Sequence, residues 1–304
     1  MDALRHPRFQ RAENFPPMEL TLRDAEILRL VQRHRFLRSH QLAALIGGSR
    51  QQLLRRLQSL YHHGFVERPL SQIDYYQRGG SQSMVYGLAN RGAAHLARAD
   101  EYSVPRLDWN ARNRHTTRLF LEHALMISEI IVALELAARS IPGVRILHHG
   151  ESSKWKIPMR GSAPVTVIPD TLFSIKHTRP GGTTDTILFA LEADRGTMPV
   201  QSANRLRSSI ARKLTAYEAS WRANVFRQRF GATRVQVLTI TTSTARLASI
   251  TEHARSHVSA AGLFHFATLA ELTASPTQFL AALVDCKTPA TAQTMFEFAP
   301  LPAT

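Results

Sequence analysis

Three short amphipathic segments followed by a glycine-rich hairpin, all within the first hundred residues, are the sequence feature that most constrains the fold. Apolar side chains recur with helical spacing over residues 21–34, 39–46 and 50–63. Gly47-Gly48 ends the second segment, and Ser49 is placed to cap the third. The spacing therefore predicts three short helices in succession.

A hairpin is expected next, because residues 65–66 and 84–86 have strand character and enclose a glycine-rich loop over 77–82. Asn90 is then positioned to cap a fourth helix that reaches about residue 99. Three helices followed by a hairpin with a basic tip is the element order of a winged helix-turn-helix domain. We assign residues 18–100 to such a domain.

In a winged helix the third helix enters the major groove, and its first turns reach the bases. The polar residues on the face of this helix opposite its leucines are Arg50, Gln51, Gln52, Arg55 and Arg56. Arginine suits a bidentate contact with guanine, and glutamine one with adenine. Arg78 at the hairpin tip suits a phosphate or minor-groove contact. These residues predict double-stranded DNA as the partner; the alternative is a solvated polar face.

The charge balance supports a polyanionic partner. The chain of 304 residues carries 38 Lys+Arg against 23 Asp+Glu, a formal net charge of +15. Residues 1–100 hold 15 arginines, no lysine and 8 acidic residues, so the positive charge is densest at the predicted winged helix. With 44% hydrophobic residues, the chain has enough apolar material to build a core.

Composition also excludes several classes of protein. A lone cysteine, Cys286, cannot form an intrachain disulfide, which fits a reducing compartment. The N-terminus has no apolar signal segment, and the most apolar helix, over 119–138, is interrupted by three glutamates. We therefore expect a cytoplasmic protein with no membrane segment.

The second half of the chain alternates strands and helices, which indicates an α/β layer domain. We assign residues 116–285 to it, residues 1–17 to a flexible basic arm, 101–115 to a linker and 286–304 to a C-terminal tail. Helices are expected over 116–140, 202–226 and 244–260, and strands over 144–148, 164–176, 186–193, 235–241 and 263–267. The chain as a whole is predicted to be α+β.

One strand of the second half ends in Pro169-Asp170, and another ends in Glu192-Ala193-Asp194. Adjacent strands would place the carboxylates of Asp170 and Glu192 side by side, where they would hold Mg²⁺ for phosphodiester cleavage. The pattern resembles the PD-(D/E)xK nuclease signature, which implies a three-layer restriction-endonuclease-like fold. It departs from that signature because Asp194 stands where the lysine is expected.

Three further residues bear on this resemblance. Lys213 lies one helical turn before Tyr217 and would supply the missing lysine from a helix, as in some members of that superfamily. Glu129 would provide the helical carboxylate, with Glu122 as its rival. The alternative is that Asp170 and Glu192 only finish their strands and pair with nearby arginines, Arg195 or Arg212.

The whole layout resembles the replication-relaxation family of plasmid and mobile-element proteins. The most specific part is the run Glu192-Ala193-Asp194-Arg195-Gly196-Thr197 followed by Lys213-Leu214 and Tyr217. Other matching stretches cover residues 35–43, 56–66, 85–92, 121–125 and 169–170. In this family an aspartate is expected at position 194, so Asp194 favours the family and weakens the nuclease interpretation.

The resemblance implies a DNA-binding protein of a plasmid or integrated mobile element that acts in replication initiation or DNA relaxation, through its winged helix, at an origin or control site. Its second domain is then nuclease-like without the full catalytic machinery, and serves assembly or holds a vestigial site. Its expected partners are a second copy of the chain and replication or relaxase proteins. One alternative is an active Mg²⁺-dependent endonuclease or nickase using Asp170, Glu192 and Lys213. The other is a transcriptional regulator whose second domain serves dimerisation.

Overall fold

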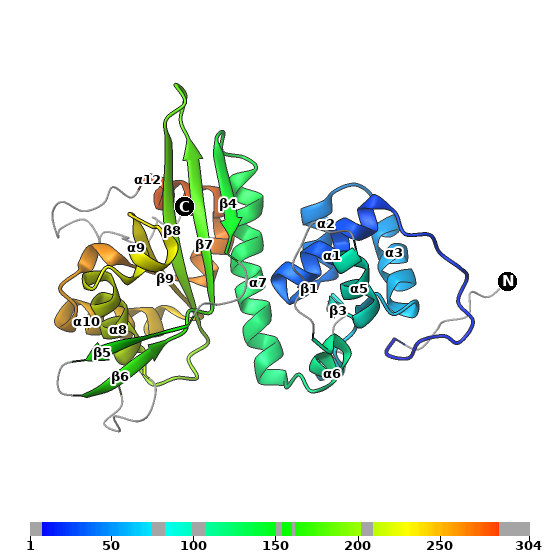
Figure 1. The fold of residues 1–304 in the computed structure, drawn as a ribbon, viewed down its shortest axis with the longest axis horizontal. Helices are drawn as coiled ribbons and strands as arrows, with labels where there is room; N and C mark the ends of the chain where they lie inside the picture. The colour runs from blue at the N-terminus through cyan, green and yellow to red at the C-terminus, as the bar shows by residue number, and fades with distance from the viewer. Residues whose placement is uncertain are drawn as a thin grey trace. The chain divides into compact units, whose positions relative to one another are not determined.

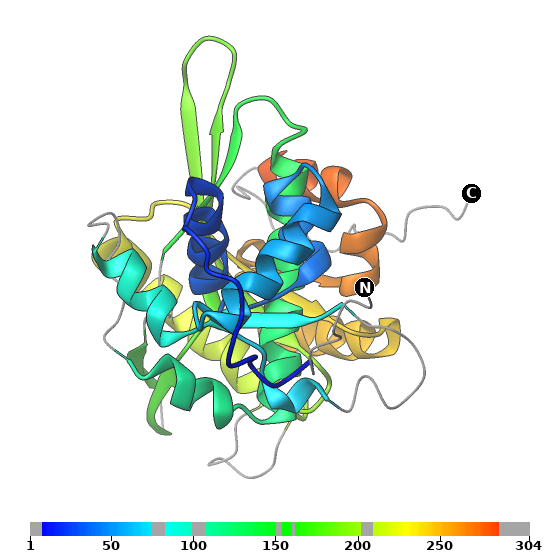
Figure 2. The same cartoon turned by 90° about the vertical axis from the view of Figure 1, so that its right-hand side faces the viewer.

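The computed structural model describes residues 8–73, 83–98, 107–149, 154–159, 162–201 and 209–285. The chain folds into two compact units, Met1–Val132 and Ala133–Thr304, and the architecture is mixed α/β of the α+β class (Figures 1 and 2). The division falls inside the long helix α7, Arg118–Ala138. Each unit is described by itself below.

The first unit contains the predicted helices and hairpin strands, together with a short strand and two short helices that the sequence pattern did not indicate. Three antiparallel strands form its sheet in the order β1-β3-β2. The elements are α1 (Leu22–His34), β1 (Phe36–Arg38), α2 (Ser39–Ile46), α3 (Arg50–His62), β2 (Val66–Glu67), η1 (Leu70–Gln72), β3 (Val85–Leu88), α5 (Asn90–Arg98) and α6 (Trp109–Arg114).

Local interactions set the helix ends of this unit. Thr21 and Asp24 form a reciprocal capping box at the start of α1, and the Ser49 hydroxyl accepts from the amide of Gln52 at the start of α3. Close packing sets the position of α5: a Cβ on Gly92 would lie 2.2 Å from the carbonyl oxygen of Phe65. Only glycine therefore lets α5 approach the chain before β2 this closely.

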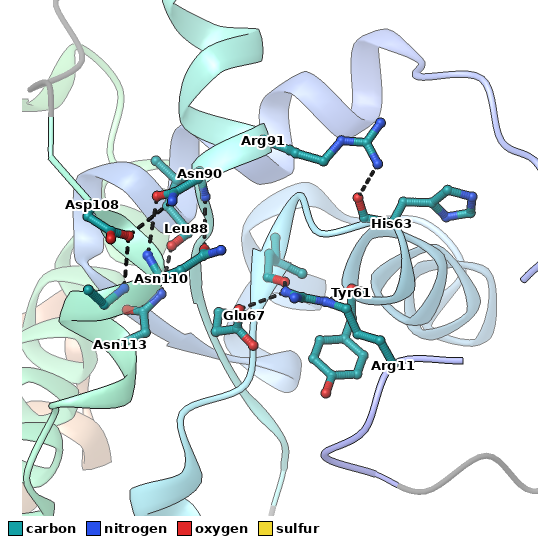
Figure 3. Close-up of polar contacts among 12 residues, drawn as sticks. Arg11, Tyr61, His63, Glu67, Leu88, Asn90, Arg91, Asp108, Asn110 and Asn113 are labelled. Atoms are coloured by element: carbon teal, nitrogen blue, oxygen red, sulfur yellow. Dashed lines mark hydrogen bonds and ion pairs between the residues drawn. The ribbon is translucent and has the colours of Figure 1, made fainter. Parts of the chain in front are cut away.

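The segment predicted as a flexible arm is docked where it is described, over residues 8–17. The Arg11 guanidinium donates to the Tyr61 carbonyl at 2.9 Å and to the Glu67 carboxylate at 2.7 Å (Figure 3). The Phe15 ring stacks on His62, with centroids 4.3 Å apart. The prediction was wrong for these residues because arginine and aromatic side chains find partners on α3 and β2 that lie about fifty residues away in the sequence.

Part of the predicted linker is also structured. Helix α6 lies within the range 101–115, and its Trp109 is buried. Asn90 and Asn110 exchange hydrogen bonds between backbone amides and side-chain oxygens, and the Asn113 amide donates to the Leu88 carbonyl at 2.8 Å (Figure 3). These contacts join α6 to the first unit, so residues 107–115 belong to its fold and do not form a linker.

The second unit is built on a five-stranded sheet in the order β10-β9-β8-β7-β4. The β4–β7 and β7–β8 pairs are antiparallel, whereas the β8–β9 and β9–β10 pairs are parallel. The strands are β4 (Val144–His148), β5 (Trp155–Met159), β6 (Ser162–Val167), β7 (Thr171–Thr178), β8 (Thr184–Asp194), β9 (Val235–Thr241) and β10 (Phe264–Thr268). The helices besides α7 are α8 (Ile210–Arg222), α9 (Val225–Phe230), α10 (Thr244–His257), η2 (Ala261–Leu263), α11 (Leu269–Ala274) and α12 (Pro276–Asp285).

The single strand predicted over 164–176 is two strands in the structure. β6 pairs with β5 in a separate two-stranded sheet, and β7 enters the main sheet at Thr171. Pro169 lies in the break and has no N–H to donate to a ladder. Alternating apolar residues run through both strands, so the pattern alone did not reveal the break.

The two faces of β8 carry different side chains. Leu188 and Ala190 belong to a buried cluster with Leu214 of α8 and Ile250 of α10, so this face is covered by those two helices (Figure 1). Phe189 points the other way and stacks on Phe173 of β7 with centroids 5.1 Å apart. Because side chains alternate along a strand, Glu192 and Asp194 lie on the α8 face.

Candidate DNA-binding helix and carboxylate site

Helix α3 presents the polar face that the sequence predicted. Leu53, Leu57 and Leu60 are buried, and the side chains exposed to solvent on the first two turns are Arg50, Gln51, Gln52, Leu54 and Arg55. Ser49 holds the first turn through its hydrogen bond to the amide of Gln52. The apolar stripe therefore fixes the helix on the unit and leaves a row of arginine and glutamine side chains outward.

Arg56 differs from its neighbours on α3. Its Nε donates to Asp24 Oδ1 and its Nη2 to Asp24 Oδ2, both at 2.6 Å, and Nη2 also contacts the Glu19 carbonyl. The Asp24 side chain is fully buried. The guanidinium of Arg56 is thus occupied within the protein, and this residue positions α3 against α1 rather than standing free for DNA.

The structure adds two residues to this surface that the sequence reasoning missed. The pKa of the His40 imidazole is lowered, first by partial burial and then by the positive charges of Arg38 and Arg50. Arg38 directly precedes α2, His40 lies in its first turn, and Arg50 is the first residue of α3. The sequence signal was the pair of basic residues flanking Ser39. Arg78, the predicted contact at the hairpin tip, lies outside the described residues.

Asp170 and Glu192 lie opposite each other, as the sequence predicted. β7 pairs with β8 so that Thr171 is opposite Leu191, which continues the register to Asp170 and Glu192. The Asp170 amide donates to the Leu191 carbonyl at 3.0 Å, and Asp170 Oδ2 accepts from the Ala193 amide at 2.8 Å. Asp170, directly before β7, therefore lies beside Glu192 near the end of β8.

Glu192 is buried and is held from α8. The Lys213 ammonium contacts its Oε2, and the Tyr217 hydroxyl donates to its Oε1 at 2.6 Å. Burial raises the pKa of Glu192 to about 7, with Lys213 lowering it and Asp170 raising it further. Burial lowers the pKa of Lys213, but the charges of Glu192 and Asp170 outweigh burial and raise it overall. Lys213 and Tyr217 thus join the carboxylates, and Arg195 and Arg212 are not the partners of Glu192.

Asp194, which stands at the expected lysine position, has its own partners. Arg246 of α10 donates from Nε to Asp194 Oδ2 at 2.8 Å and from Nη2 to Oδ1 at 3.1 Å. The Thr241 hydroxyl, opposite Asp194 in the β8–β9 register, donates to Oδ2 at 2.9 Å. The Asp194 carboxylate therefore ties β8 to β9 and α10, a role that sequence spacing did not indicate.

The predicted third carboxylate belongs to the first unit, whereas Asp170 and Glu192 belong to the second. Glu129 is exposed on α7 within the first unit, and its rival Glu122 pairs with Arg118 on the same helix. Among the residues that the structure describes, no three histidine, cysteine, aspartate or glutamate side chains lie close enough together to hold a metal ion. Protein ligands for a cation at this site would thus be Asp170 and Glu192.

Among the comparisons with known proteins, one, with family models, gives a match. No curated protein and no solved structure matches the chain. None of the described helices has the length and apolar character needed to cross a membrane. The replication-relaxation family model, however, matches residues 28–235, which is more than half of the chain and includes α3, Asp170, Glu192 and Lys213. The chain therefore belongs to the replication-relaxation family.

Proposed function

We propose that this protein binds double-stranded DNA through α3 and acts in the replication or relaxation of plasmid or mobile-element DNA. The observation that carries the proposal is the exposed row Arg50, Gln51, Gln52 and Arg55 on a helix whose opposite face is buried. Helices α1 to α3 and the β2–β3 pair follow the order of a winged helix, in which the third helix reads the major groove.

The surface divides into two kinds of contact. Arginine and glutamine side chains on the first turns of α3 suit base edges, because each offers a bidentate pattern that one base matches. Arg38 and His40, at the start of α2, suit the phosphate backbone, which positions the protein without reading sequence. The formal net charge of +15 supplies long-range attraction for the duplex.

A salt titration of duplex binding tests this proposal. We expect Arg50→Ala and Arg55→Ala each to weaken binding, and to reduce the slope of log K against log salt by about 0.9 for each phosphate that the variant no longer neutralises. Arg98→Ala, an exposed arginine on α5, removes the same charge from another helix and serves as the control. Affinities and slopes equal to those of the control would reject α3 as the DNA-binding helix.

A second candidate function, metal-dependent DNA cleavage, is favoured by the contact between Lys213 and Glu192 opposite Asp170. Mg²⁺ in proteins is held by one or two carboxylates together with water and phosphate oxygens, so this pair fits it. A bound cation would stabilise the negative charge that develops on a phosphodiester. Tyr217 orients the Glu192 carboxylate, and Lys213 holds a positive charge beside it, where a DNA phosphate would be attracted.

Cleavage is tested by incubating the protein with supercoiled plasmid and Mg²⁺ or Mn²⁺. The expected result is nicking that disappears in Asp170→Asn and Lys213→Met, with duplex binding unchanged in both. Asp185→Asn, at a half-buried aspartate at the far end of β8, is the matched control and should nick normally. Intact DNA binding without nicking by the unaltered protein would reject the second function and leave the first in place.

A further inference from the structure

A cavity of about 460 Å³ lies where α8 ends, in the second unit. It is lined by the last turn of α8, the turn into α9 and the start of β9. This volume is within the range of ordinary small-molecule sites. None of its lining residues belongs to α3 or to the Asp170–Glu192 site, so neither proposed function accounts for it.

Trp221 on the cavity wall is unusual in this chain. Its side chain is 46% exposed, whereas the other two tryptophans, Trp109 and Trp155, are each 3% exposed. A tryptophan left open to solvent beside a cavity offers a flat aromatic face for stacking. Nucleic-acid bases are the ligands that stack on such faces regardless of sequence.

Two arginines give the cavity a positive charge. Arg222 is held by Glu218 at 2.9 Å and also contacts Ser259, so its guanidinium has a fixed orientation. Glu218 is buried and also accepts from the backbone amides of Ser259 and Ala260, which keeps its carboxylate directed into the protein. Arg227 makes no ion pair with the described residues. The cavity therefore presents guanidinium groups without an acidic side chain of its own.

A sharp turn brings these groups together. Asn224 lies in the left-handed region with φ 55°, and it immediately precedes the first residue of α9. Trp221 and Arg222 on one side of the turn thus face the same cavity as Arg227 on the other. The buried side chains of Phe226 and Val235 add an apolar floor.

We propose that this cavity binds an unpaired nucleotide, with the base stacked on Trp221 and the phosphate beside Arg227 and Arg222. An aromatic wall, an apolar floor and guanidinium groups within one cavity match the base and phosphate of a nucleotide. In duplex DNA the base faces are covered by their neighbours, so the site selects nucleotides that are unstacked. The source is a single DNA strand or a free nucleotide, which share this chemistry.

Tryptophan fluorescence and the anisotropy of a labelled oligonucleotide test the site in the full-length protein. An oligothymidylate of ten nucleotides should quench the tryptophan fluorescence saturably, because Trp221 is exposed to solvent whereas Trp109 and Trp155 are buried. Trp221→Ala should raise the dissociation constant about tenfold, and Arg227→Ala should raise it several-fold. Arg229→Ala is the matched control, because Arg229 is an exposed arginine of the same helix that does not line the cavity; it should change binding less than twofold.

Competition identifies the source of the nucleotide. If thymidine monophosphate displaces the oligonucleotide at comparable concentration per nucleotide, the site takes a free nucleotide; if only longer strands compete, it takes a single strand. Equal competition by a duplex would show general electrostatic attraction and overturn the proposal. Equal effects of Arg227→Ala and Arg229→Ala, or unchanged binding in Trp221→Ala, would overturn it too. Arg55→Ala should bind the oligonucleotide as the unaltered protein does, even though its duplex binding is weakened, so the two proposals can fail independently.

Discussion

Arg56 of α3 and Asp24 of α1 form a two-point ion pair that fixes one helix against the other, with both hydrogen bonds at 2.6 Å. Burial raises the pKa of Asp24, but Arg56 and Thr21 outweigh burial and hold it below its ordinary value. The same Asp24 closes the capping box of α1. One carboxylate therefore sets both where α1 begins and how the proposed DNA-binding helix is oriented.

Arg56→Ala is expected to destabilise the first unit by about 3 kcal/mol, because it leaves the buried carboxylate of Asp24 without its cation. Arg55→Ala, one position earlier and exposed, should stay within about 0.5 kcal/mol of the unaltered protein. Urea denaturation of both variants, followed by circular dichroism, makes the comparison. Equal midpoints would contradict the positioning role of Arg56.

Asp194→Lys restores the residue type of the nuclease signature but is expected to damage the fold. The Asp194 side chain is buried, so the new ammonium would lie beside the guanidinium of Arg246 with no carboxylate between them. The free energy of unfolding is expected to fall by about 3 kcal/mol or more. Asp185→Lys makes the same change at a half-buried position of β8, in ion pairs open to solvent, and should cost at most about 1 kcal/mol. Thermal unfolding of the two variants checks this, and similar melting temperatures would refute it.

His265 on β10 predicts a pH dependence of stability. Burial lowers the pKa of its imidazole from 6.5 to about 4. Between those values the unfolded chain binds a proton at this residue that the folded protein does not, so the contribution of His265 to stability falls as the pH falls, by about 3 kcal/mol in total. The stability of His265→Gln relative to the unaltered protein should therefore increase as the pH falls, whereas that of His257→Gln, at an exposed site on α10, should not change with pH. Urea midpoints measured from pH 4 to pH 7 give the test.

For Glu192 we predict a contribution to stability that depends on pH with the opposite sign. Its pKa rises from 4.5 to about 7 in the folded protein, chiefly through burial. The folded state keeps a proton in that window that the unfolded state releases, so this residue's contribution to stability falls as the pH rises. Glu192→Gln cannot ionise, and its stability relative to the unaltered protein should increase from pH 4.5 to 7. Parallel stability curves for the two proteins would exclude the raised pKa.

The sequence predicted those parts of the structure that depend on short-range periodicity. The apolar spacing of Leu53, Leu57 and Leu60 placed the polar face of α3 correctly, and β9 occupies the predicted range. The pairing of Asp170 with Glu192 was also predictable, because the two positions flank an antiparallel hairpin and lie at the same end of it.

Contacts between distant segments could not be predicted in this way. Arg56 and Asp24 are 32 positions apart, and Arg246 and Asp194 are 52 apart. Periodicity assigns each of these side chains to a face of its own helix or strand, but the partner depends on how the elements pack. The docking of Arg11 on β2 and the exchange of hydrogen bonds between Asn90 and Asn110 have the same origin.

Because side chains alternate between the two faces of β8, the position of an insertion or deletion decides whether the family can accept it. A shift of one residue between β7 and β8 would turn Ala193 toward α8 and move both acidic side chains to the opposite face. The turn that joins the two strands, Arg179 to Thr183, contains glycines with open space around them. Insertions are therefore expected to survive in that turn, whereas a single added residue between Thr184 and Asp194 would dismantle the carboxylate site in one step.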